Sequence, residues 1–198
     1  MTDRATSCAI AAAALLCAVL TACAAIADEA ADDCAAAKMK AAGRYGQGLL
    51  ACNAVATRQD EMVDPLCTAS AAGKLEDAFQ RAEDGGGCAT QSDAGAIEDG
   101  VSGDIDTVLS ALAPDPTDQA RACAASKMKA AGKHYSSLLA CYAKGAKRSE
   151  GPDPVCPTKV LAKLISSYQK ADARGGCTVT DDTEIGRASC RERVYVLV

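Results

Sequence analysis

The sequence is poor in aromatic side chains and in histidine. Of its 198 residues, five are Tyr, one is Phe, one is His and none is Trp. Hydrophobic residues make up 49% of the chain, but many of them are Ala, which buries little area per residue. The chain therefore cannot build a large core of bulky side chains, and a domain with so thin a core usually needs covalent staples. Twelve cysteines are present that could supply them.

Motifs for the common metal, redox and nucleotide sites are missing as well. The sequence has no C-x-x-C pair for thiol exchange and no C-x-x-C-H for covalent haem. The repeated part spaces its cysteines at least 15 residues apart, whereas zinc sites use close pairs. Gly46-Gln47-Gly48 lacks the Gly-Lys-Ser/Thr ending of a phosphate loop, and Asp104-Ile105-Asp106 lacks the glycine and final glutamate of a calcium loop.

What the chain does contain is one stretch that occurs twice. Residues 34–52 read CAAAKMKAAGRYGQGLLAC, and residues 123–141 read CAASKMKAAGKHYSSLLAC. Thirteen of the 19 positions are identical, at a constant offset of 89. The same offset relates the two cysteines that follow in each copy, so the framework is duplicated as a whole.

The first copy, residues 34–113, is expected to form three helices, at about 34–59, 65–84 and 93–112. Asp64-Pro65 provides an N-cap and a favoured first helical residue, and Gly85-Gly86-Gly87 provides a stop. The third helix has apolar residues at three- and four-residue spacing, as a core-facing helix requires. These are Ile97, Val101, Ile105, Val108 and Leu112.

The second copy, residues 119–183, follows a linker at 114–118 that contains Pro114-Asp115-Pro116. Its first helix is expected at Cys123–Lys147, and its second begins at Pro154. A third helix would begin near Thr183, where the repeat pattern is lost. The sequence therefore predicts a truncated second repeat.

The cysteine spacing predicts which residues form disulfides. Eighteen residues are five full helical turns, so Cys34 and Cys52 lie on one helical face about 27 Å apart. A disulfide needs Cα atoms within about 7 Å, which excludes their pairing in a continuous helix. A crossed pattern would join opposite ends of an antiparallel hairpin, so a nested pattern remains. We expect Cys34–Cys88 and Cys52–Cys67 in the first copy, and Cys123–Cys177 and Cys141–Cys156 in the second.

Together these features predict an all-α protein with two disulfide-stapled antiparallel helical hairpins in tandem, the first followed by a third helix. The repeated Cys-x3-Lys-x-Lys-Ala-Ala-Gly, Leu-Leu-x-Cys, Asp-Pro-x-Cys and Gly-Gly-Cys elements resemble those of Ala/Lys-rich four-cysteine helical-hairpin repeat proteins from bacterial genomes. The nested pattern also resembles plant α-hairpinins, but their paired C-x3-C motifs are absent here. The bacterial resemblance covers about residues 34–112 and 123–182 and implies no particular activity.

The N-terminus favours export. Residues 1–22 have the order of a secretory signal peptide: Arg4, an apolar run from Cys8 to Leu20, then small residues. Leu20-Thr21-Ala22-Cys23 resembles the bacterial lipobox, which implies a lipid anchor on Cys23, followed by a tether at residues 23–33. Ordinary cleavage after Ala25-Ile26-Ala27 is the alternative. The protein is expected in the bacterial periplasm or at the cell surface when lipid-anchored, or secreted when cleaved after Ala27.

The C-terminal residues 184–198 do not continue the repeat. Glu184 to Val194 reads EIGRASCRERV, which resembles the in-frame translation of a short-read sequencing adapter. We expect this tail to be artefactual. Without Cys8, Cys17, Cys23 and Cys190, eight cysteines remain, four in each repeat.

Charge suggests where a partner would bind. Residues 28–117 carry 6 basic and 17 acidic groups, a net charge of −11, whereas residues 118–183 carry 11 and 6, a net charge of +5. Opposite charges could draw the repeats together or direct the second towards an anionic surface, or both faces could simply be solvated. A contact patch for an anionic partner, or a solvated face, is expected at Lys38, Lys40, Lys127 and Lys129.

No constellation of catalytic groups emerges. The only histidine, His134, corresponds to Tyr45 in the first copy, so a solvated or core-edge position is expected for it. We expect no enzyme, metal site or cofactor, and no binding of nucleic acid. The sequence favours a structural or interaction module of the cell envelope with a protein partner. The alternative is a carrier of a small apolar ligand in a crevice lined by Leu75, Phe79 and Ile97.

Overall fold

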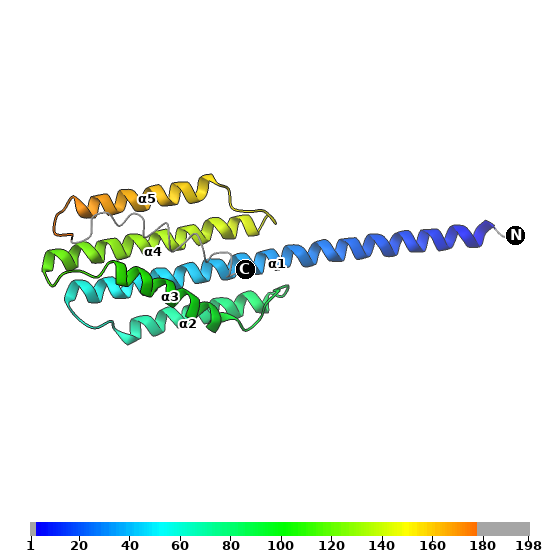
Figure 1. Cartoon of the computed structure of the whole chain (residues 1–198). Coiled ribbons are helices and arrows are strands. Elements are labelled where there is room, and N and C mark those ends of the chain that lie inside the picture. Colours follow the sequence, from blue (N-terminus) through cyan, green and yellow to red (C-terminus); the bar gives the residue numbers. More distant parts are fainter. Residues whose placement is uncertain (1–2, 178–198) are drawn as a thin grey trace.

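The computed structural model describes residues 3–177, and the side chains from residue 29 onwards. Within that range every regular element is a helix, which confirms the all-α class (Figure 1). The helices are α1 (Asp3–Gln59), α2 (Pro65–Asp84), α3 (Ala94–Ala111), α4 (Asp118–Ala146) and α5 (Val155–Asp172). Hairpin α1–α2 is followed by α3, and hairpin α4–α5 comes after it. The expected end of the second repeat and the tail at 184–198 lie outside the described residues.

Two helices begin earlier than the cysteine pattern suggested. Helix α1 starts at Asp3 and continues through residues 23–33, so the stretch expected to form the tether is helical. This stretch is rich in Ala, the strongest helix former, and contains neither Gly nor Pro to interrupt it. In Figure 1 the first half of α1 extends beyond the bundle. Helix α4 begins at Asp118 because the Thr117 side chain caps it, accepting a hydrogen bond from the Ala120 N–H.

The turns use the chemistry that the sequence predicts. The Asp64 carboxylate accepts a hydrogen bond from the Leu66 N–H, and Asp153 accepts one from the Val155 N–H in the second copy. After α2, Gly86 and Gly87 have φ values of 78° and 79°, a left-handed conformation that favours glycine. Helix α2 therefore has the bounds expected for it, Pro65 to Asp84.

The two repeats pack through α1 and α4, which run antiparallel (Figure 1). Gly43 of α1 approaches Ser136 of α4, and Gly132 of α4 approaches Gln47 of α1. Adding the offset of 89 to Gly43 and Gln47 gives Gly132 and Ser136, so the two contacts are equivalent under exchange of the repeats. The repeats therefore face one another across a pseudo-two-fold axis, as the subunits of a symmetric dimer do.

Polar contacts join the repeats at both ends of the α1–α4 interface. Lys147 Nζ lies 2.6 Å from Asp33 Oδ1, and Arg121 Nη1 lies 3.4 Å from Asp60 Oδ2. Ser149 also donates a hydrogen bond to Asp32. These contacts agree with the idea that the oppositely charged repeats attract one another, although exposed ion pairs contribute little stability.

The hydrophobic core lies where α1, α2, α3 and α4 meet. Tyr45, Leu50, Leu75 and Phe79 are buried there. The apolar stripe expected on α3 is present, since Val101, Ile105, Val108 and Leu112 are buried and Ile97 is partly buried. The structure also contains the four nested disulfides, with Cα separations between 5.3 and 6.0 Å. Each hairpin is therefore stapled at both ends.

Candidate functional site

Two of the four lysines expected to form a contact patch are buried. Lys38 is 8% exposed and Lys127 is 2% exposed, so the prediction of an accessible patch is wrong for both. Their side chains point into the hairpins and bind acidic residues of the same repeat. Lys40 is half-buried and Lys129 is exposed. Lys40 on α1 is thus partly accessible and Lys129 on α4 is accessible. The four lysines do not form one accessible patch.

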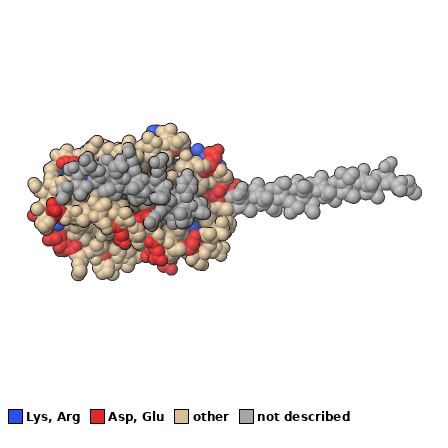
Figure 2. All heavy atoms as spheres, viewed as in Figure 1, with Lys and Arg blue, Asp and Glu red and all other residues tan. Residues whose placement is uncertain are grey.

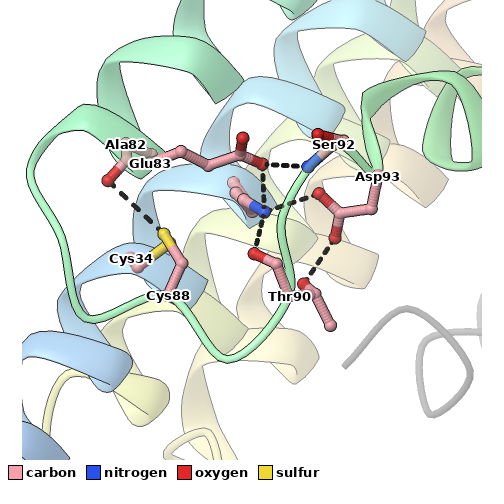
Figure 3. The surroundings of a disulfide bond; sticks show 8 residues. Cys34, Ala82, Glu83, Cys88, Thr90, Ser92 and Asp93 are labelled. Atoms are coloured by element: carbon pink, nitrogen blue, oxygen red, sulfur yellow. Dashed lines mark hydrogen bonds and ion pairs between the residues drawn. A yellow bond between two sulfur atoms is a disulfide. The ribbon is translucent and has the colours of Figure 1, made fainter.

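The Lys38 ammonium group is held by oxygen atoms from three residues, Glu83, Thr90 and Asp93, which are labelled in Figure 3. Nζ lies 2.5 Å from Asp93 Oδ1, 2.8 Å from Glu83 Oε1 and 2.9 Å from the Thr90 carbonyl oxygen. The Phe79 ring centroid is 5.1 Å away, within the range of a cation–π contact. All three donor positions of the ammonium group are therefore used within the repeat.

Hydrogen bonds and the attraction of opposite charges keep Lys38 and Asp93 ionised. Burial by itself would lower the pKa of Lys38, but its hydrogen bonds to Asp93 and Glu83, together with the negative charges of these two carboxylates, outweigh burial and raise the pKa. Burial would likewise raise the pKa of Asp93, but hydrogen bonds from Lys38 and Thr90 lower it. Both residues are therefore charged at neutral pH.

The same acidic groups order the loop between α2 and α3. Thr90 Oγ1 donates to Asp93 Oδ2 at 2.6 Å, and the Ser92 N–H donates to Glu83 Oε1 at 3.0 Å. The loop also carries Cys88, whose disulfide to Cys34 lies one helical turn before Lys38 (Figure 3). A disulfide and an ion-pair cluster, one helical turn apart on α1, thus both hold the loop against this helix.

The second repeat contains an equivalent lysine site. Lys127 Nζ lies 2.7 Å from Asp172 Oδ1 and 5.3 Å from the Tyr168 ring centroid. Asp172 and Tyr168 correspond to Glu83 and Phe79 at the offset of 89. The sequence did carry a signal for these partners, because an acid three residues before the Gly-Gly-Cys element occurs in both copies. The structure shows the role of this acidic residue, because folding of the hairpin places its carboxylate next to the buried lysine.

A cavity of 280 Å³ lies beside Lys38, between α1, the α2–α3 loop and α3. Phe79 and Ile97 line it, as the ligand-carrier hypothesis expected, whereas Leu75 does not and is 2% exposed within the core. Met39, Ala42 and Leu139 add apolar surface, and Lys38, Thr90 and Asp93 form a polar wall. The cavity could accept a small ligand with an apolar body and a polar end.

Among the residues that the structure describes, one group has the spacing of metal ligands. A sulfur atom from each of Cys123 and Cys177 and a carboxylate oxygen of Asp172 lie within 4.8 Å of one another. The two cysteines form a disulfide and therefore offer no thiolate, the form that binds metal. The arrangement reflects the position of the Lys127–Asp172 pair beside the disulfide.

His134 lies in the second repeat and does not line the cavity beside Lys38. It is 7% exposed, and its Nδ1 is 3.4 Å from the Val160 carbonyl oxygen. Burial lowers its pKa, and the contact with Val160 offsets this in part. The expectation of a core-edge position therefore holds for His134.

Comparison of the chain with protein-family models, with curated proteins and with solved structures finds no match. Among the described residues, no helix has the length and apolar character needed to cross a membrane.

Proposed function

We propose that this chain is an exported structural or interaction module of the bacterial cell envelope. The observation that carries the proposal is that all eight cysteines between residues 34 and 177 form disulfides. Four disulfides indicate an oxidising, extracytoplasmic environment, because reduced thiols prevail in the cytosol. The signal-peptide pattern at residues 1–22 supports the same conclusion.

An interaction role suits the way in which the repeats use their charges. The buried lysines bind acids of their own repeat, and Asp33, Asp60, Arg121 and Lys147 join the repeats to one another. These contacts fix the shape of the scaffold and leave its outer faces to contact a partner. A rigid stapled scaffold loses little conformational entropy when it binds, which favours affinity.

Attachment by a lipid on Cys23 is the preferred route, with secretion after cleavage at Ala27 as the alternative. Expression in a bacterial host, followed by fractionation and intact-mass measurement of the mature protein, distinguishes the two. A lipidated N-terminus at Cys23 that is lost in Cys23→Ala supports the anchor, and a mature N-terminus at Asp28 supports secretion. Retention of the whole chain in the cytoplasm with reduced cysteines would contradict the proposal.

Carriage of a small apolar ligand is the second candidate, favoured by the cavity that Phe79 and Ile97 line. Its volume is near the lower end of ligand pockets, about 300 Å³. Native mass spectrometry of protein purified from envelope extract should then show an added ligand mass. Ala35→Trp, at a half-buried residue that lines the cavity, should abolish the added mass, whereas Ala37→Trp at an exposed residue of the same helix should preserve it.

A further inference from the structure

A groove of 650 Å³ lies between α4 and α5. It has an apolar floor and a basic rim. The floor includes Ala130, His134, Val160 and Leu164, and the rim includes Lys133, Lys163 and Lys170 with Ser137, Ser166 and Ser167. The three rim lysines are exposed, and none of the described residues that line the groove is acidic.

The corresponding surface of the first repeat is covered by a helix. At the offset of 89, the four floor residues correspond to Ala41, Tyr45, Ala71 and Leu75. All four belong to the hydrophobic core that also contains Val101 and Ile105 of α3. The Tyr45 hydroxyl group lies 3.3 Å from Glu98 Oε1 and 3.1 Å from Ser102 Oγ, so α3 lies directly over this position.

The basic rim is also present in both repeats. Lys133, Lys163 and Lys170 correspond to Arg44, Lys74 and Arg81, which are exposed on α1 and α2. Helix α3, the occupant in the first repeat, is acidic and contains no basic residue. Its acidic residues are Glu98, Asp99, Asp104 and Asp106. Figure 2 shows acidic side chains over the lower half of the bundle, where α2 and α3 lie.

We infer that the groove between α4 and α5 is a docking site for an acidic amphipathic helix with the pattern of α3, presented by a partner protein. The inference rests on the proposed function as an interaction module and names the chemistry of its partner. Apolar residues of the partner helix at three- and four-residue spacing would meet Val160 and Leu164. Carboxylates along its edges would meet the rim lysines.

The lining of this groove differs from its counterpart at two positions, one on the floor and one on the rim, in ways that suit a reversible contact. His134 replaces Tyr45, and Ser167 replaces Ala78. Both changes make the groove more polar, as non-obligate interfaces are when compared with a permanent core. Val160 and Leu164 argue for a helix over a phosphate or another small anion, because such an anion gains nothing from an apolar floor.

A peptide of residues 92–113, which contains α3, provides the probe. Labelled with a fluorophore, it should bind the full-length disulfide-bonded protein saturably, as measured by anisotropy. Neutralising the rim with Lys133→Gln, Lys163→Gln and Lys170→Gln should weaken binding about tenfold, the combined effect of three exposed ion pairs. The matched control is Arg44→Gln, Lys74→Gln and Arg81→Gln, which changes the corresponding exposed residues beside a floor that α3 already covers and should leave binding unchanged.

A scrambled peptide of the same composition separates helix docking from general anion binding. Equal binding of the scrambled and native peptides, or no saturable binding of either, overturns the inference. So does equal weakening by the two sets of substitutions. Circular dichroism of each variant shows that the fold is retained. Export and peptide binding are measured separately. An exported protein that does not bind the peptide contradicts this inference alone. A cytoplasmic protein that binds the peptide contradicts the proposed function alone.

Discussion

Lys38 of α1 and Asp93, the residue before α3, form an ion pair with 2.5 Å between Nζ and Oδ1. This contact ties the first helix of the hairpin to the start of the third helix, across 55 residues of sequence. Glu83 at the end of α2 joins the same ammonium group, so one lysine connects three helices. The third helix of the first repeat is therefore positioned by charge as well as by its apolar face.

Replacing Lys38 with Met should destabilise the protein strongly. The change keeps the apolar stem but leaves the carboxylates of Glu83 and Asp93, 13% and 26% exposed, without their cation. Breaking a buried ion pair on one side costs about 3 kcal/mol in unfolding free energy. Urea denaturation at pH 7 measures the loss. Lys40→Met on the same helix is the control, expected to cost less than about 0.5 kcal/mol. Equal losses in both variants would show that the pair is unimportant.

His134 should make the second repeat sensitive to acid. Its pKa in the folded state is lowered below 6.5, chiefly by burial, so the unfolded chain binds a proton at higher pH than the folded chain does. The stability that depends on neutral His134 is therefore complete above pH 6.5 and declines as the pH falls through that value towards the lower folded pKa. Thermal unfolding from pH 7.5 to 5 should show this decline. It should be smaller in His134→Tyr, which carries the residue of the first copy.

Local features of this fold were predictable because they depend on short-range rules. Asp64-Pro65 and the glycines after Asp84 set the ends of α2, and the five-turn spacing of Cys34 and Cys52 indicated the nested disulfides. The partner of Lys38 was not predicted, because the hairpin and the following loop bring distant acids to it. The spacing of Lys38 along α1 does not distinguish an inward from an outward side chain.

The packing of one repeat on the other could not be predicted from the sequence either. Helix propensity alone predicts that Gly43 weakens its helix, since glycine is a poor helix former. The structure shows its second property, the absence of a side chain where α1 and α4 approach closely. Periodicity within one repeat carries no information about which faces of two repeats meet, and so the pseudo-two-fold arrangement could not be inferred.

The outer disulfide of each hairpin should contribute more stability than the inner one. Cys34–Cys88 closes a sequence separation of 54 residues, and Cys52–Cys67 one of 15. In the chain-entropy model these loops correspond to about 4 and about 3 kcal/mol. The double variant Cys34→Ala/Cys88→Ala should therefore lose about 1 kcal/mol more than Cys52→Ala/Cys67→Ala. Denaturation under non-reducing conditions gives the comparison. A larger loss from removal of the inner bridge would contradict the expected order.

Gly43 and Gly73 provide a matched test of the interface between the repeats. Both lie inside helices, where Gly→Ala normally stabilises by roughly 0.5–1 kcal/mol. A Cβ atom at Gly43 would lie 3.1 Å from the Ser136 Cα and 3.2 Å from the Leu139 Cβ, whereas one at Gly73 would meet nothing within 4 Å. Gly73→Ala should accordingly stabilise the protein. Gly43→Ala should destabilise it by about 1–3 kcal/mol, because overpacking forces α1 and α4 apart. The difference in urea midpoint between the two variants measures the effect, and equal stabilisation by both would show that the repeats do not pack closely at this position.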